Sequence, residues 1–272
     1  MAGANAFFTT VKAPTLTGAP SVGTPISLAV KAWTPVVDHF SYQWYVDGKA
    51  IPDAIDRLYV PAAKDLGHRL RASVTGVKDG FLTVTTWAPT SAKVAPGTFR
   101  TKAPTIVGAI KTGKRLSVVT GVWSPKADAC TYRWYRSGHP IARATKATYV
   151  LTAADLGKHV SVTVKGYAAG FNARSASSKR TRVVTEGPVT SSEPQIIGLG
   201  SADLEVDPGA WGPGKITFRY QWLWDGRPIP HATGKTYVLT AADYGHVLAV
   251  AVTGDRSSYT AVTRITRGIT IT

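Results

Sequence analysis

Clusters of lysine and arginine are the residues of this chain whose type and spacing suggest a chemistry. Two stretches, 111–115 and 174–182, are the densest, and two further arginines lie on one predicted strand. A dense positive field attracts polyanions through long-range steering and through the release of counterions. The candidate polyanion-binding residues are Lys111, Lys114, Arg115, Arg133, Arg136, Arg174, Lys179, Arg180 and Arg182.

The positive charge is concentrated in the middle of the chain. The 272 residues include 32 Lys and Arg against 16 Asp and Glu, which gives a net charge of +16. Residues 97–188 hold 16 basic and 3 acidic side chains, a balance of +13, whereas residues 1–96 carry +3 and residues 189–272 carry zero. A charge that served solubility alone would be shared among similar segments. A solvated basic face that only aids solubility is the competing interpretation.

Patterns of catalytic or metal-binding residues are missing from the sequence. The six histidines are scattered without a metal-ligand spacing, and there is no Gly-x-Ser-x-Gly elbow, phosphate loop or calcium-binding loop. Asp65, Asp155 and Asp243 each precede a glycine by two residues. Their threefold recurrence indicates turn-capping groups rather than catalytic acids. We therefore expect no enzyme activity, no cofactor and no metal site.

A threefold repeat supplies the elements that position these groups. Three tryptophans are each followed two residues later by proline, and eleven residues later by a second tryptophan. A tyrosine, an aspartate and a glycine then follow at the same spacing in every copy. The six tryptophans, expected to be core residues, are Trp33, Trp44, Trp123, Trp134, Trp211 and Trp222.

Each copy has the alternation of short β-strands. Tyr42 and Trp44 fall on one face of a predicted strand, and the dipeptide that follows, Asp47-Gly48, is typical of a tight hairpin turn. No helical pattern runs longer than a single turn. The sequence predicts an all-β protein of three tandem immunoglobulin-like β-sandwich domains in an extended array.

The repeat also predicts the domain boundaries. We expect an N-terminal extension over 1–12 and domains over 13–96, 103–184 and 194–272, joined by short linkers that contain Pro and Gly. The middle domain is the strongly basic one. The first residues lack the features of a signal peptide, and no run reaches the roughly 18 apolar residues of a membrane span. The single cysteine, Cys130, excludes a disulfide within the chain.

The second copy carries the repeat most fully, in Trp123-Ser-Pro125, Tyr132-Arg-Trp-Tyr135 and Tyr149-Val-Leu-Thr-Ala-Ala-Asp155-Leu-Gly157. This pattern resembles the Ig-like repeats of exported and cell-surface proteins of Gram-positive actinobacteria. The first copy departs from it at 53–55 and 61–64, and the third at Leu223-Trp224. The resemblance implies stalk, spacer and wall- or polymer-binding roles, and it brings no catalytic residues.

Three functions remain open at this stage. The first is a non-enzymatic extracellular or cell-surface module that acts as a spacer and attaches to an anionic polymer through its basic middle domain. Its partner would be a teichoic acid, an acidic polysaccharide, a nucleic acid or an acidic protein surface. The second is a structural or decoration protein of a phage virion. The third is a self-assembling surface fibre subunit, a homo-oligomer formed by pairing of sandwich edge strands.

Overall fold

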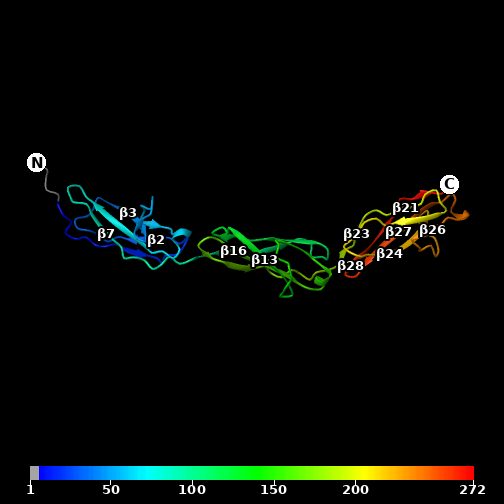
Figure 1. Cartoon of the computed structure of the whole chain (residues 1–272), viewed down its shortest axis with the longest axis horizontal. Coiled ribbons are helices and arrows are strands. Elements are labelled where there is room, and N and C mark those ends of the chain that lie inside the picture. Colours follow the sequence, from blue (N-terminus) through cyan, green and yellow to red (C-terminus); the bar gives the residue numbers. More distant parts are fainter. Residues whose placement is uncertain (1–5) are drawn as a thin grey trace. The chain divides into compact units, whose positions relative to one another are not determined.

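The computed structural model describes residues 6–272, and the regular structure of these residues is β-strand apart from three single turns of 3-10 helix (Figure 1). The prediction of an all-β protein built from tandem immunoglobulin-like sandwiches is confirmed. Contacts group the chain into two compact units. One unit holds the first repeat with residues 121–131 and 164–176. The other holds residues 104–120, 132–163 and 177–272.

The first repeat contains a three-stranded sheet, β1-β2-β5, and a four-stranded sheet, β4-β3-β6-β7. Its elements are β1 (Thr15–Thr17), β2 (Ile26–Ala29), β3 (His39–Val46), β4 (Lys49–Ala50), β5 (Leu58–Tyr59), η1 (Ala63–Asp65), β6 (Leu70–Val77) and β7 (Val84–Trp87). The longest pairing runs between β3 and β6, from His39 opposite Val77 to Val46 opposite Leu70.

The second repeat has the sheets β10-β11-β15 and β14-β13-β16-β18, with two short pairs, β12-β9 and β17-β8. Its elements are β8 (Gly97–Thr98), β9 (Arg100–Thr101), β10 (Thr105–Val107), β11 (Arg115–Val119), β12 (Trp123–Ser124), β13 (Ala129–Arg136), β14 (His139–Pro140), β15 (Thr148–Val150), η2 (Ala153–Asp155), β16 (Val160–Tyr167), β17 (Phe171–Asn172) and β18 (Arg174–Ser177).

The third repeat has the sheets β21-β22-β26 and β19-β28-β27-β24-β25, with β29 beside β27 and a short pair, β20-β23. Its elements are β19 (Gly187–Pro188), β20 (Thr190–Ser191), β21 (Gln195–Ile197), β22 (Asp203–Asp207), β23 (Trp211–Gly212), β24 (Thr217–Trp224), β25 (Arg227–Pro228), β26 (Thr236–Val238), η3 (Ala241–Asp243), β27 (Val247–Arg256), β28 (Tyr259–Ile265) and β29 (Ile269–Thr270).

A two-residue turn closes the central hairpin of each repeat. Between β3 and β4 the turn residues Asp47 and Gly48 have φ values of 45° and 83°. Two successive positive φ values match a type I′ turn, whose twist suits that of the flanking strands. Ser137-Gly138 and Asp225-Gly226 have the same signs of φ. The dipeptides that the sequence marked as turns are therefore hairpin turns.

The second tryptophan of each repeat is the centre of a hydrophobic cluster. Trp44, Trp134 and Trp222 are fully buried. Each lies 5.0–5.6 Å, centroid to centroid, from the ring of the repeat's tyrosine. Each indole N–H donates to a backbone carbonyl at 2.9–3.0 Å. The ring is therefore buried without leaving its polar atom unpaired, as a core tryptophan requires.

The first tryptophan of each repeat packs over a glycine of a long strand. Trp33 is buried, whereas Trp123 and Trp211 are half-buried. A Cβ atom added to Gly76, Gly166 or Gly254 would clash with the ring of the tryptophan in its own repeat. The bare backbone of these strands therefore provides the space for the indole.

The segments that the sequence favours as linkers form strands. Residues 97–101 contain β8 and β9, and residues 187–191 contain β19 and β20. Phe99, between β8 and β9, is 1% exposed and meets Trp123 edge to face at 5.4 Å between ring centroids. Within the predicted N-terminal extension, Phe8 meets Trp33 in the same way, and residues 1–5 lie outside the described residues. The predicted domain boundaries stay a prediction.

Candidate functional site

A carboxylate in the single helical turn organises the same corner of each repeat. Asp65, Asp155 and Asp243 are buried, and each accepts a hydrogen bond from the backbone N–H three residues before it, at 2.6–2.8 Å. The hydroxyl of the repeat's tyrosine also donates to each carboxylate, at 2.6–2.8 Å. These contacts cap the turn and tie it to the preceding strand.

A further donor reaches this carboxylate in two of the three repeats. The Nε atom of Arg136 donates to Asp155 at 2.7 Å, and the Nε1 atom of Trp224 donates to Asp243 at 2.5 Å. Burial alone would raise the pKa of both carboxyls, but the hydrogen bonds hold it below its ordinary value of 3.8. Burial and the nearby carboxylate raise the pKa of Tyr237 to about 12. Arg136 is thus bound to an internal carboxylate, unlike the other candidate residues.

The strongest gathering of positive charge lies at this corner of the second repeat. The stretch after β18 runs antiparallel to the start of β16, with Val184 N–H bonded to the Lys158 carbonyl and Thr181 N–H bonded to the Val160 carbonyl, both within 2.9 Å. Arg180 lies beside the β13–β14 turn, since its Nη2 atom is 3.9 Å from where a Cβ of Gly138 would be. We define the basic corner as the exposed residues Lys158, Lys179, Arg180 and Arg182.

The other two repeats carry an aspartate–histidine pair at the equivalent corner. The carboxylate of Asp47 contacts the Nδ1 atom of His68 at 2.5 Å, and Asp225 contacts His246 at 2.6 Å. In the second repeat the matching residues are Ser137 and Lys158. The acid is lost and an exposed lysine stands in place of the histidine, so this corner gains a positive charge and loses a carboxylate.

The turn that carries Lys111 and Lys114 contacts the same segment. Thr112 N–H donates to the Thr185 carbonyl at 3.0 Å, and Thr185 N–H donates to the Ile110 carbonyl at 3.1 Å. Residues 178–185 therefore lie between the start of β16 and this turn. Backbone pairing thus brings together Lys111, Lys114 and the basic corner, which are separated by up to 71 residues in sequence.

Three candidates lie elsewhere. Arg115 is exposed on β11, where it faces Val150 across the strands. Arg133 is exposed on β13, next to the buried Trp134. Arg174, on β18, belongs to the other compact unit, where its Nη1 atom donates to the carbonyl of Phe99 at 3.0 Å.

Lys158 was missed by sequence reasoning because it stands alone, outside both dense clusters. A signal was present in the alignment of the repeats, where Lys158 replaces His68 and His246 while Ser137 replaces Asp47 and Asp225. A comparison of charge position by position would have found it. Cys130, by contrast, lies half-buried on β13, and burial raises the pKa of its thiol, which favours the protonated form.

Among residues 6–272, no three His, Cys, Asp or Glu side chains are grouped so that they could hold a metal ion. Within the same range, no helix has the length and apolar character needed to cross a membrane.

Comparisons with known proteins give no family. No protein family and no curated protein matches the sequence. The three N-terminal domains of the highly immunogenic outer capsid protein of bacteriophage RB49 match over 95% of this chain and 98% of that chain, at 11% identity and a TM-score of 0.29. An ICAM-5 ectodomain fragment matches over 94% and 75%, at 12% identity and a TM-score of 0.31. Similarity this low carries no argument about function.

Proposed function

We propose that this chain is a non-enzymatic structural and binding module that works outside the cytoplasm, on a cell surface or on a virion. In this proposal the first and third repeats act as spacers. The second repeat attaches to an anionic polymer through the basic corner together with Lys111 and Lys114.

One observation carries the proposal. Three copies of one framework differ in charge at one corner, where Asp47–His68 and Asp225–His246 are paired and Ser137–Lys158 is not. Arg180 and Arg182 stand beside this unpaired lysine on the segment bonded to it. Fixed cations gathered on a rigid backbone bind a polymer of phosphates or carboxylates by displacing its counterions.

The test compares two variants of equal charge. Arg180→Glu/Arg182→Glu reverses charge at the basic corner, and Arg143→Glu/Lys146→Glu reverses two exposed charges in the loop before β15 of the same repeat. Binding to immobilised glycerol-phosphate teichoic acid is measured between low and high salt. We expect the corner variant to bind at least about tenfold more weakly and to show a salt dependence shallower by about two charges, since each lost phosphate contact removes about 0.9 from the slope.

The control variant should keep most of the binding. An equal loss in both variants would show that only net charge matters, and no binding of the unmodified chain at low salt would end the proposal. Polyglucuronate and duplex DNA, measured side by side with the teichoic acid, distinguish the class of polymer.

A further inference from the structure

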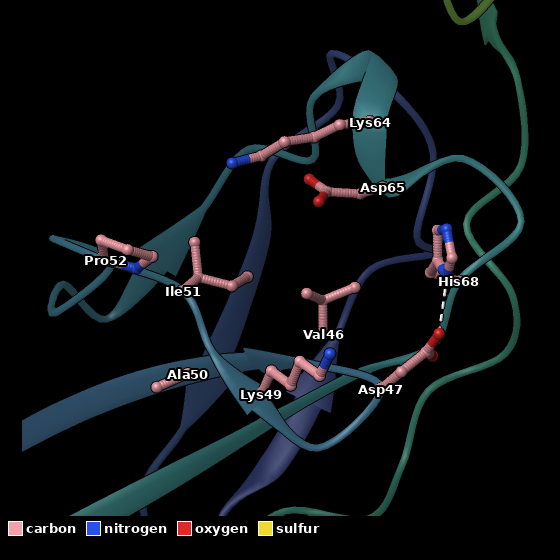
Figure 2. Close-up of a pocket in the computed structure, with 9 residues that line it drawn as sticks. All are labelled: Val46, Asp47, Lys49, Ala50, Ile51, Pro52, Lys64, Asp65 and His68. Atoms are coloured by element: carbon pink, nitrogen blue, oxygen red, sulfur yellow. Dashed lines mark hydrogen bonds and ion pairs between the residues drawn. The ribbon is translucent and has the colours of Figure 1, made fainter.

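The first repeat contains a pocket at the corner that the other two repeats fill. Its volume is about 280 Å³, just below the roughly 300–1,000 Å³ found for small-ligand sites. Figure 2 shows Val46, Ile51 and Asp65 lining one space, with His68 beside it and bonded to Asp47. A pocket of this size suits one ring system rather than an extended chain.

In the third repeat, a side chain of the protein itself fills the space that matches this pocket. The side chain of Trp224, the residue that matches Val46, donates from Nε1 to Asp243 at 2.5 Å. Its ring stacks on His246 with 5.4 Å between ring centroids and 18° between the planes. His246 is held in turn by Asp225. An indole is therefore clamped between an acceptor at its N–H and an imidazole on its face.

The first repeat keeps the aspartate and the histidine that hold this indole, but it has no indole at the matching position. Val46 is too short to reach Asp65, which is 1% exposed and receives both of its hydrogen bonds at Oδ2. Oδ1 of the matching carboxylates, Asp155 and Asp243, accepts from the side chain at the strand position of Val46, namely Arg136 and Trp224. Asp47 holds His68 as Asp225 holds His246. Valine has no hydrogen-bond donor to offer at this position, and Asp65 lines the pocket, so the site favours a ligand that brings a donor.

The apolar wall is retained as well. Ile51 and Pro52 line the pocket where the third repeat has Ile229 and Pro230. Ile51 is buried, so it offers a fixed surface to one edge of a ring. Five lining residues of the first repeat are the same as those at the matching positions of the third, namely Asp47, Ile51, Pro52, Asp65 and His68.

We infer that this pocket binds the indole ring of an external ligand, with the indole N–H donating to Oδ1 of Asp65 and the ring against Val46, Ile51 and His68. The ring can belong to a free indole or to the tryptophan side chain of a partner. In the second repeat the side chain of Arg136 fills the equivalent space, so a guanidinium group is the alternative ligand. Lys49 and Lys64 line the pocket in the first repeat, and these two cations favour the neutral ring.

The experiment titrates the full chain with indole, N-acetyltryptophanamide, N-acetylargininamide and indene, and follows the imidazole signals of His68 by NMR. Indole should shift these signals in a saturable way. Indene has the same shape without the N–H, and we expect it to bind about tenfold more weakly because the hydrogen bond to a carboxylate is lost. Equal affinities for indole and N-acetyltryptophanamide indicate that the natural ligand is a tryptophan side chain. A higher affinity for free indole indicates a small molecule.

Two variants locate the site. Val46→Trp installs the residue of the third repeat and should abolish the shift at His68. Trp224→Val opens the matching space in the third repeat and should create a second saturable shift, at His246. Tighter binding of N-acetylargininamide than of indole, or no shift at His68 up to millimolar indole, would overturn the inference. Arg180→Glu/Arg182→Glu should leave indole binding unchanged, so the result is independent of polymer attachment.

Discussion

At the scale of single residues, the side chain at one strand position decides whether each turn carboxylate receives an additional hydrogen bond. The residue nineteen positions before Asp65, Asp155 and Asp243 is valine, arginine and tryptophan in turn. The sequence allowed the prediction that these aspartates cap turns, because their recurrence before a glycine has a structural cause. It did not allow the prediction that Arg136 is an internal partner, because a strand arginine and a turn aspartate meet only after the sheets have packed.

The number of donors predicts how much each carboxylate stabilises its repeat. Asp155 accepts four hydrogen bonds and Asp65 accepts two. We expect Asp155→Ala to cost about 2–4 kcal/mol, since it leaves Arg136 and Thr152 without their acceptor, and Asp65→Ala to cost about 1–2 kcal/mol. Hydrogen exchange of the amides in each turn measures the two losses separately. Equal losses would contradict the role given to the additional donors.

The lowered pKa of Asp155 predicts a dependence on acid. A carboxyl whose pKa is lower in the folded than in the unfolded state stabilises the fold fully above its ordinary value of 3.8. This contribution is lost as the pH falls through the lowered folded-state value. Acid titration followed by hydrogen exchange in the second repeat should show the loss below about pH 3.8. Asp155→Asn should flatten it, whereas Asp53→Asn, at an exposed turn, should leave it in place.

At the scale of elements, the sequence predicted strands and hairpin turns well and strand-forming connections poorly. The alternation in β3, β13 and β24 and the Asp-Gly or Ser-Gly turns after them have local causes, namely side-chain alternation and positive φ. Residues 97–101 looked like a linker because Pro96 and Gly97 stand at their start. Their place as strands depends on Phe99 packing against Trp123, a contact between residues far apart in sequence.

This difference can be tested by limited proteolysis. If residues 97–101 are paired strands, trypsin should cut after Arg100 much more slowly than after Lys215, which lies in the exposed loop between β23 and β24. Mass spectrometry of the early fragments identifies the order of cleavage. A first cut after Arg100 would restore the interpretation of this segment as a free linker.

At the scale of the whole molecule, side chains of the second repeat contact both neighbouring repeats. Phe171, at the start of β17 in the second repeat, packs against the hydrophobic cluster of the first. Its ring occupies the space where Gly23 and Gly97 carry no side chain. Between the second and third repeats, the buried Thr112 donates to the carbonyl of Ser258 at 2.9 Å and accepts from Gly187 N–H at 2.9 Å. Stability should therefore depend on neighbours, as in other repeat proteins.

Phe171→Ala should weaken the first repeat although it changes the second. We expect a loss of about 1–3 kcal/mol, less than for a fully buried phenylalanine because this ring is half-buried. The loss should appear as faster hydrogen exchange around Val22, which lies in the cluster that Phe171 contacts. Phe7→Ala, at a side chain that is 70% exposed, is the matched control. Protection lost only within the second repeat would show that the two are independent.

The position of Phe171 also limits how these repeats can be exchanged. A first repeat cut off at residue 96 would carry an uncovered apolar surface where that ring belongs, and would be prone to aggregate. A repeat transplanted into another array would need a neighbour that offers an equally large aromatic side chain at the same loop. The unit that can be exchanged is therefore a repeat together with the loop of the next repeat that covers its apolar surface. Gene duplication or protein design that keeps only the spacing of the tryptophans would omit this loop.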